Sequence, residues 1–412
     1  MTGEKGPFRV EFDPKSTCLE CLLSLCLQAR QLACERDDRW LFEGLDLDIQ
    51  SGEIVRIEGP NGSGKTTLLK ILSGQLTDYR GELYWNGEPM RQAREHFLAN
   101  LLYLGHAPGV KAGLSPLENL AWYQALSGEK GSEPAREAAL AAVGLAGFED
   151  VPAGQLSAGQ QRRVALARLT LTQRALWVLD EPFTGLDRPA GDGFAARLAD
   201  LRNAGRSVLL VTHDLDEAAL AERVGVLVDG RLHQVAEPGE LYRRPATLTV
   251  ARLLGGFVEV PGTVVPTTGG PQHRSAWGCW SLPGDAGAAG RSTSGDAVLL
   301  VRREDLRLVP DGPRDGHPTG PGVRGRVVAS RRRGVRVVAV VETSDRSRVE
   351  VELAPREDVA VGTPVGVRPA DGAAVWAVDA PEPDPSGTTR HTRHAADLPG
   401  SGPRACDDAL RD

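Results

Sequence analysis

The sequence contains no run of about 20 consecutive apolar residues, so no segment of it could cross a bilayer as a single helix. The nearest candidate, residues 18–27, is short and is interrupted by Glu20. It also lacks the basic start and the small-residue cleavage site of a secretory signal. We therefore expect a cytoplasmic protein.

Cysteine and positive charge are also scarce. Six cysteines in 412 residues are too few for a disulfide scaffold, and the C-x-x-C pair Cys18 and Cys21 has no second pair or histidine nearby. The 48 lysines and arginines are outnumbered by 55 acidic residues, which gives a net charge of −7. This balance argues against a nucleic acid as the main partner, because duplex-binding proteins carry a basic face.

Glycine and proline are abundant, at 48 and 28 residues, and must lie in turns, linkers or special backbone sites. A hydrophobic fraction of 41% is ordinary for a globular protein, so the chain can bury a real core. A length of 412 residues exceeds that of one typical domain. Two domains and a tail are therefore expected.

Strand and helix patterns alternate in the first part of the chain. Leu45, Leu47 and Ile49 alternate with polar residues, as in a half-buried strand. Further strands are expected at 54–57, 101–104, 175–179 and 207–212, with helices at 68–72, 162–171 and 192–201. This alternation predicts an α/β fold with a mostly parallel sheet covered on both faces.

The amino-acid composition changes near residue 255. Residues 261–296 are rich in Gly, Pro, Ser and Thr, which is typical of a linker, and short β-type runs follow. Such runs with Gly and Pro turns predict a small barrel or sandwich. The predicted organisation is an irregular extension at 1–29, an α/β domain at 30–257, a linker at 258–296, a β domain at 297–380 and a disordered tail at 381–412.

A phosphate-binding pattern, Gly59-x4-Gly64-Lys65-Thr66, follows the strand at 54–57 and precedes a helix, as a P-loop requires. Glycines let backbone N–H groups wrap a diphosphate or triphosphate closely. Lys65 would reach the β and γ phosphates, and the Thr66 hydroxyl would ligate Mg²⁺. The expected ATP-binding residues are Gly59, Pro60, Asn61, Gly62, Ser63, Gly64, Lys65, Thr66 and Thr67.

Two adjacent acids end a second strand. The run 175–179 is continuously apolar, as in a central parallel strand, and Asp180 and Glu181 follow it. Two carboxylates at the end of a buried strand are costly unless a cation lies beside them. Asp180 would hold Mg²⁺ through its water shell, and Glu181 would polarise the attacking water as a general base.

A third element, residues 156–163, opens an amphipathic helix. Ser157 and Gln160 have the spacing of a capping box, which by itself indicates only a well-capped helix. Gly159 leaves the helix N-terminus open to close approach, so this is a second possible anion site.

In this order the motifs resemble those of ATP-binding cassette (ABC) transporter ATPases. Residues 156–160 resemble the family's signature motif, Asp187 its D-loop aspartate and His213 its switch histidine. The resemblance implies a P-loop ABC ATPase domain with a helical signature subdomain, in which Lys65, Glu181 and His213 are catalytic. It also implies a dimer with a second copy or a paralogous ATPase. In that dimer the signature residues Ser157, Ala158, Gly159 and Gln160 of one subunit face the ATP bound by the other.

The resemblance further implies that ATP joins the two subunits and that hydrolysis lets them part. The motion would pass to an integral membrane permease subunit, which places this chain at the cytoplasmic face of the inner membrane as a peripheral protein. The loop after 101–104 departs from the family pattern, because His106 stands in the segment that normally carries a glutamine. We assign His106 to the metal site with Thr66 and Asp180. For adenine stacking, Trp40 and Arg36 both remain open.

Two subfamilies compete along the chain. Residues 33–37, 103–106, 144–150 and 156–168 look like the ATPase of the cytochrome c maturation system, the haem exporter subunit, over about residues 31–190. Residues 237–255 instead are similar to importer ATPases for oxyanions, iron, polyamines or sugars, which carry a small C-terminal β domain. We favour the cytochrome c maturation type. The alternatives are such an importer and a soluble ABC-type clamp, which typically holds two cassettes where this chain has one P-loop.

Overall fold

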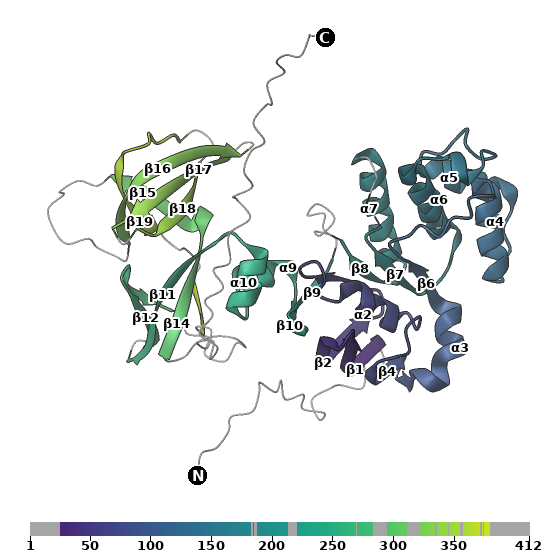
Figure 1. Ribbon diagram of the computed structural model, residues 1–412, viewed down its shortest axis with the longest axis horizontal. Coiled ribbons are helices and arrows are strands. Elements are labelled where there is room, and N and C mark those ends of the chain that lie inside the picture. Colours follow the sequence, from purple (N-terminus) through teal and green to yellow (C-terminus); the bar gives the residue numbers. More distant parts are fainter. Residues whose placement is uncertain are drawn as a thin grey trace, which may run out of the picture.

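The computed structural model describes residues 25–182, 184, 188–212, 221–268, 270–282, 295–310, 322–333, 336–344, 346–354, 357–370, 373 and 375–379. These residues form two lobes, the first at 25–256 and the second at 257–379 (Figure 1). Within this described part of the chain, no helix has the length and apolarity needed to cross a membrane.

A six-stranded sheet lies at the centre of the first lobe, in the order β10-β9-β3-β8-β7-β6. Its strands are β3 (Ile54–Glu58), β6 (Leu101–Leu104), β7 (Leu176–Asp180), β8 (Ser207–Val211), β9 (Arg223–Val228) and β10 (Arg231–Ala236). All its pairings are parallel except that of β9 with β10. Every residue of β7 and β8 is buried. The mostly parallel sheet predicted from the sequence is therefore present.

Helices flank this sheet on both sides. The helices packed on it are α2 (Lys65–Leu72), α3 (Met90–Asn100), α6 (Ala158–Leu171) and α7 (Arg188–Asn203). Further from the sheet, α4 (Pro116–Leu126), α5 (Glu133–Ala142) and the short turn η1 (Ala153–Gln155) pack with α6 in a separate apolar cluster. Leu68 and Ile71 of α2 pack in the apolar cluster on one face of the sheet, whereas Leu166 and Leu169 of α6 pack in the cluster on the other. The helices that follow the two glycine-containing motifs are thus anchored on opposite faces of one sheet.

A smaller antiparallel sheet, in the order β2-β1-β4-β5, covers α2. Its strands are β1 (Leu25–Arg36), β2 (Arg39–Gln50), β4 (Arg80–Trp85) and β5 (Glu88–Pro89). The sequence predicted β2 but not β1, and the irregular extension expected at 1–29 is wrong from Leu25 onward. Register shifts between Ala29 and Leu32 and between Leu32 and Cys34 break the period-two pattern that would have revealed β1. Residues 1–24, with Cys18 and Cys21, lie outside the described part of the chain.

The second lobe consists of two five-stranded sheets, in the orders β13-β12-β11-β14-β20 and β15-β19-β16-β17-β18. The strands are β11 (Phe257–Thr267), β12 (Gly270–Ser275), β13 (Gly278–Ser281), β14 (Gly295–Arg302), β15 (Leu306–Pro310), β16 (Val323–Arg333), β17 (Arg336–Thr343), β18 (Arg348–Leu353), β19 (Pro364–Pro369) and β20 (Val375–Asp379), with a short turn η2 (Arg303–Asp305). One cluster, which includes Leu299, Val327 and Val351, joins both sheets into a single core.

The linker expected at 258–296 contains three strands instead. β11 pairs along most of its length with β14, and β12 and β13 continue the same sheet. Val260 and Val264 of β11 are buried in the core of the second lobe. The described Gly and Pro residues of this segment therefore lie in strands and hairpin turns rather than in a linker. Residues 283–294 lie outside the described part of the chain.

The helices α9 (Pro238–Arg243) and α10 (Leu248–Leu254) lie between the lobes (Figure 1). Val250 of α10 belongs to a core cluster of the first lobe. Leu248 and Ala251, on the same helix, pack instead with Leu300 and Trp376 of the second lobe. The second lobe is therefore packed against the first through a shared helix.

Arg302, the last residue of β14, makes a second connection between the lobes. Its guanidinium lies between the rings of Tyr242 and Phe257, at 3.4 and 3.6 Å from their centroids. It also donates hydrogen bonds to the carbonyls of Tyr242 (3.0 Å) and Gly255 (2.9 Å). Burial lowers the pKa of Arg302 to about 10, and nearby Asp305 opposes that shift.

We expect Arg302→Ala to destabilise the junction by about 2 kcal/mol, because it removes a cation from between two rings and leaves partly buried carbonyls without their donor. Thermal unfolding of the full chain measures this effect. Arg307→Ala is the matched control, since Arg307 is exposed and its guanidinium donates to the Glu304 carbonyl at a long 3.3 Å. Equal midpoints of thermal unfolding for the two variants would contradict the role of Arg302 in stabilising the junction between the lobes.

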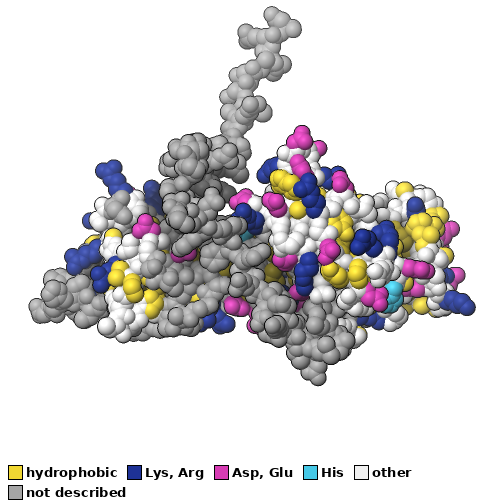
Figure 2. Space-filling model, turned by 90° about the horizontal axis from the view of Figure 1, so that it is seen from below, with side chains coloured by type: hydrophobic (Ala, Val, Ile, Leu, Met, Phe, Trp, Pro, Cys, Tyr) yellow, Lys and Arg dark blue, Asp and Glu magenta, His cyan; other side chains and the backbone are white. Residues whose placement is uncertain are grey.

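Figure 2 shows one face of the molecule. On its described part, basic and acidic side chains are interspersed and form no continuous basic stripe.

Candidate functional site

The loop between β3 and α2 is held in a tight turn by its glycines. Gly62 and Gly64 have φ of 81° and 95°, in the left-handed region that glycine adopts without a steric cost. At Gly59, an added Cβ would lie 2.0 Å from the carbonyl oxygen of Leu227, so no side chain fits there. The loop therefore needs glycine both for its backbone angles and for its close contact with β9.

Lys65 begins α2 and folds back over this loop. Its ammonium donates hydrogen bonds to the carbonyls of Gly59 (2.7 Å) and Pro60 (3.0 Å). Burial lowers the pKa of Lys65, and the negative charges of Glu181, Asp180 and Glu58 oppose that shift. A cation held over a turn of backbone N–H groups at a helix N-terminus can bind phosphate oxygens.

Asp180 and Glu181 lie at the carboxyl end of β7. Asp180 is 1% exposed, and its Oδ2 has no hydrogen-bond partner within the described residues. A buried carboxylate oxygen without a donor is costly, so this atom fits a position beside a cation. Glu181 has a left-handed backbone, with φ of 52°, and its N–H donates to the Val211 carbonyl at 2.8 Å.

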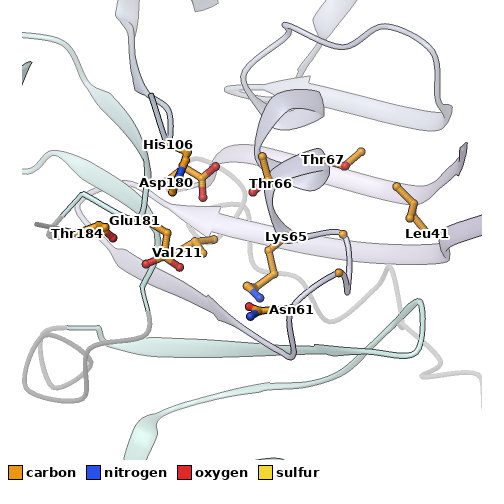
Figure 3. A pocket seen from close by; sticks show the side chains of 12 residues that line it. Leu41, Asn61, Lys65, Thr66, Thr67, His106, Asp180, Glu181, Thr184 and Val211 are labelled. Atoms are coloured by element: carbon orange, nitrogen blue, oxygen red, sulfur yellow. The ribbon is translucent and has the colours of Figure 1, made fainter. Parts of the chain in front are cut away.

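A cleft of about 530 Å³ brings these groups together. Its lining residues come from five segments of the chain: Leu41, Asn61, Gly62, Gly64, Lys65, Thr66, Thr67, His106, Asp180, Glu181, Thr184 and Val211. Figure 3 shows Lys65 beside Asn61, with Asp180 and His106 on the same side of the cleft. Ser63 lies in the same loop, and its hydroxyl is buried without a partner among the described residues.

The donor set of this cleft suits a hard cation. The Thr66 hydroxyl and the Asp180 carboxylate supply oxygen, which Mg²⁺ prefers, whereas the His106 imidazole supplies nitrogen. The buried Asp180 Oδ2 accepts no hydrogen bond from the described residues and can therefore face a cation. The oxygen donors thus fit Mg²⁺, and His106 fits better beside its water shell than as a direct ligand.

The predicted capping box opens α6. The Ser157 N–H donates to Gln160 Oε1 at 2.9 Å, and the Gln160 N–H donates to Ser157 Oγ at 3.2 Å. Ser157 and Ala158 are exposed, and Gly159 and Gln160 are partly exposed. None of these four residues lines the cleft of its own chain. The helix N-terminus is therefore available to a group outside the chain.

Two predicted site residues, Asp187 and His213, lie outside the described part of the chain. The two residues considered for adenine stacking, Trp40 and Arg36, line a separate pocket of about 310 Å³. Leu41, which the sequence did not suggest, lines the main cleft instead.

Arg162 is a buried residue of the site region to which the sequence assigned no role. Its guanidinium donates to the carbonyls of Gly105 (2.8 Å), His106 (3.2 Å), Asp180 (2.9 Å), Glu181 (2.6 Å) and Pro182 (3.1 Å). One signal in the sequence was available. Arg162 lies on the same helical face as Leu166 and Leu169, and a charge on an apolar face is unusual.

A nucleotide-sized cleft with a P-loop, an acid pair and a capped helix on a parallel sheet defines a P-loop ATPase. The family model described as ABC transporter matches residues 42–184. The chain is 54% identical over 188 residues to a protein of Hahella chejuensis and 51% identical over 187 residues to one of Escherichia coli K12. Each match covers 45% of this chain and 88% of the relative. The chain belongs to the family of ABC transporter ATP-binding subunits, and it is an ABC-type ATPase subunit.

Both relatives are named cytochrome c biogenesis ATP-binding export protein CcmA. Among solved structures, the chain is similar to one described as the ATP-binding subunit of an ABC transporter, with 24% identity and a TM-score of 0.49. That match covers 53% of this chain and 92% of the other.

Proposed function

We propose that this chain powers an exporter of the cytochrome c biogenesis or haem export type. The observation that carries the proposal is the 54% identity to a protein of that name over 88% of its length. Identity at this level extends well beyond the motifs that all such ATPases share. In this role the chain lies at the cytoplasmic face of the inner membrane as a peripheral subunit.

The geometry of the cleft supports a division of roles in hydrolysis. The loop from Gly59 to Thr67 binds the phosphates of ATP, and Lys65 exchanges its hydrogen bonds to loop carbonyls for bonds to the β and γ phosphates. Thr66 and Asp180 hold Mg²⁺, which when bound neutralises charge on the phosphate oxygens. Glu181 orients and deprotonates the attacking water as general base.

By their places in the sequence, His213 and Asp187 would act as switch histidine and D-loop aspartate. His106, which lines the same cleft, would lie near the bound Mg²⁺. The exposed N-terminus of α6, with Ser157, Ala158, Gly159 and Gln160, binds the γ-phosphate held by a second subunit. That subunit is a second copy of this chain or a paralogous ATPase. ATP then stabilises the closed dimer by contacts that hydrolysis removes.

A groove beside the cleft supports a site for the membrane permease. It measures about 510 Å³, and its lining includes Pro108 from the loop after β6, Tyr123 of α4 and Arg168 of α6. Thr66, His106 and Asp180 line both the groove and the nucleotide cleft. A permease segment in this groove would therefore contact the loop that ends at the site of hydrolysis.

The second lobe supports the main alternative, an importer ATPase for an oxyanion, iron, a polyamine or a sugar. The importer resemblance implied a small β domain after the ATPase region, and two five-stranded sheets lie there. Such a domain would stabilise the dimer or sense a ligand. A soluble ABC-type clamp has less support. The net charge of −7 and the mixed surface charge in Figure 2 do not favour a nucleic-acid partner.

We expect Glu181→Gln to lower the turnover of ATP by about 10²–10⁴-fold while ATP binding is kept, because the amide cannot accept the proton of water. Steady-state ATPase rates and titration with a fluorescent ATP analogue measure the two effects. Glu88→Gln, at an exposed position of β5, is the control and should hydrolyse normally. Near-normal turnover by the Glu181→Gln variant would contradict the role of Glu181 as the general base.

The type of transporter is tested by isolating the full chain from gently solubilised membranes and identifying the integral membrane protein that co-purifies. We expect a permease of cytochrome c biogenesis. A permease that works with a periplasmic binding protein would instead establish the importer alternative. Recovery of the chain without any membrane protein would favour the soluble clamp.

A further inference from the structure

Arg162 joins three parts of the catalytic region that are distant in sequence. It lies on α6, five residues after Ser157, and is 4% exposed. Its donors bind carbonyls 57 residues earlier, at Gly105, and 20 residues later, at Pro182. The same guanidinium therefore contacts the loop after β6 and the backbone of the acid pair.

These contacts are directed at the backbone of the general base. Glu181 has φ of 52°, and a residue with a side chain adopts this left-handed backbone only at a steric cost. Its two peptide groups are held from opposite sides. Its N–H donates to the Val211 carbonyl at 2.8 Å, and its carbonyl accepts from Arg162 at 2.6 Å. A strained backbone persists only where its surroundings fix it in this way.

We propose that Arg162 is a positioning residue for ATP hydrolysis, which holds the Glu181 carboxylate at its place in the cleft by binding the carbonyls of residues 180–182. Because it also binds the carbonyls of Gly105 and His106, it links the base to the loop that borders the proposed permease groove. A shift of that loop or of α6 is then passed to Glu181 through one side chain. The inference rests on the role proposed above for Glu181.

Lysine cannot replace arginine in this position. A guanidinium presents five donors in a rigid planar fork, whereas an ammonium is a compact point charge with three donors. Arg162→Lys therefore keeps the charge but cannot reach the carbonyls of both segments together. We expect Glu181 to lose its fixed backbone while the P-loop, which Arg162 does not contact, keeps its hold on ATP.

The chain offers a matched control in Arg174. Its guanidinium also donates to three carbonyls, those of Leu98 (2.6 Å), Ala99 (2.9 Å) and Leu101 (3.0 Å). The first two carbonyls belong to the last turn of α3 and the third to the first residue of β6, at the edge of the sheet opposite to the cleft. Arg174→Lys therefore removes bonds of the same kind without touching the site.

The experiment compares Arg162→Lys, Arg174→Lys, Glu181→Gln and the double variant Arg162→Lys/Glu181→Gln in the full chain. We expect Arg162→Lys to lower kcat by about tenfold or more with KM for ATP changed less than about threefold, since a transition-state interaction is lost. Arg174→Lys should stay within about twofold in kcat. The double variant should be no slower than Glu181→Gln alone, because Arg162 acts through that residue.

Amide hydrogen exchange of the peptide 178–182 gives a readout that does not depend on activity. We expect faster exchange in Arg162→Lys and unchanged exchange in Arg174→Lys. Unchanged exchange in both, or equal losses of kcat in both, would overturn the proposal. A further loss in the double variant would also overturn it. Normal turnover by Glu181→Gln would instead refute the role of Glu181 as the general base. If Glu181→Gln is inactive and Arg162→Lys is fully active, only the positioning role of Arg162 is refuted.

Discussion

The parallel pairing of buried strands is the constraint on which the site depends. In a parallel sheet the carboxyl ends of all strands meet at one edge. The order β3-β8-β7-β6 therefore brings the P-loop after β3, the acid pair after β7 and the loop after β6 to the same cleft. The buried residues of β7 and β8 hold this arrangement. Lys65, Asp180 and His106 lie far apart in sequence, and only this edge brings them together.

The second lobe is attached by packing and not by a tether. One face of α10 packs in the core of the first lobe and another face packs in a cluster of the second lobe. Arg302 of the second lobe donates hydrogen bonds to carbonyls of the first lobe. Any movement of α10 would consequently change the packing of both lobes. This arrangement gives the β sheets a physical route by which they could affect the ATPase, whichever transporter the subunit serves.

The sequence predicted those elements that depend on the pattern of neighbouring residues. The glycine spacing from Gly59 to Gly64, the apolar run before Asp180 and the Ser157–Gln160 cap each depend on neighbouring residues, and each is found in the structure. The sequence did not predict β1, because its bulges interrupt the alternation of apolar and polar residues. The prediction of a linker at 258–296 was wrong because Gly and Pro occur in hairpin turns as often as in linkers. The contacts of Arg162 are with backbone carbonyls of distant segments, which carry no residue-specific signal in the sequence.

We propose that this sheet edge forms a nucleotide site built around Lys65. Titration of the full chain with a fluorescent ATP analogue tests it most directly, with Lys65→Ala compared against Lys70→Ala, an exposed lysine on the same helix. Loss of charge-assisted bonds to phosphate should weaken binding by about ten- to a hundredfold in Lys65→Ala and leave Lys70→Ala within about twofold. Equal affinity of both variants and the unaltered chain would contradict the site.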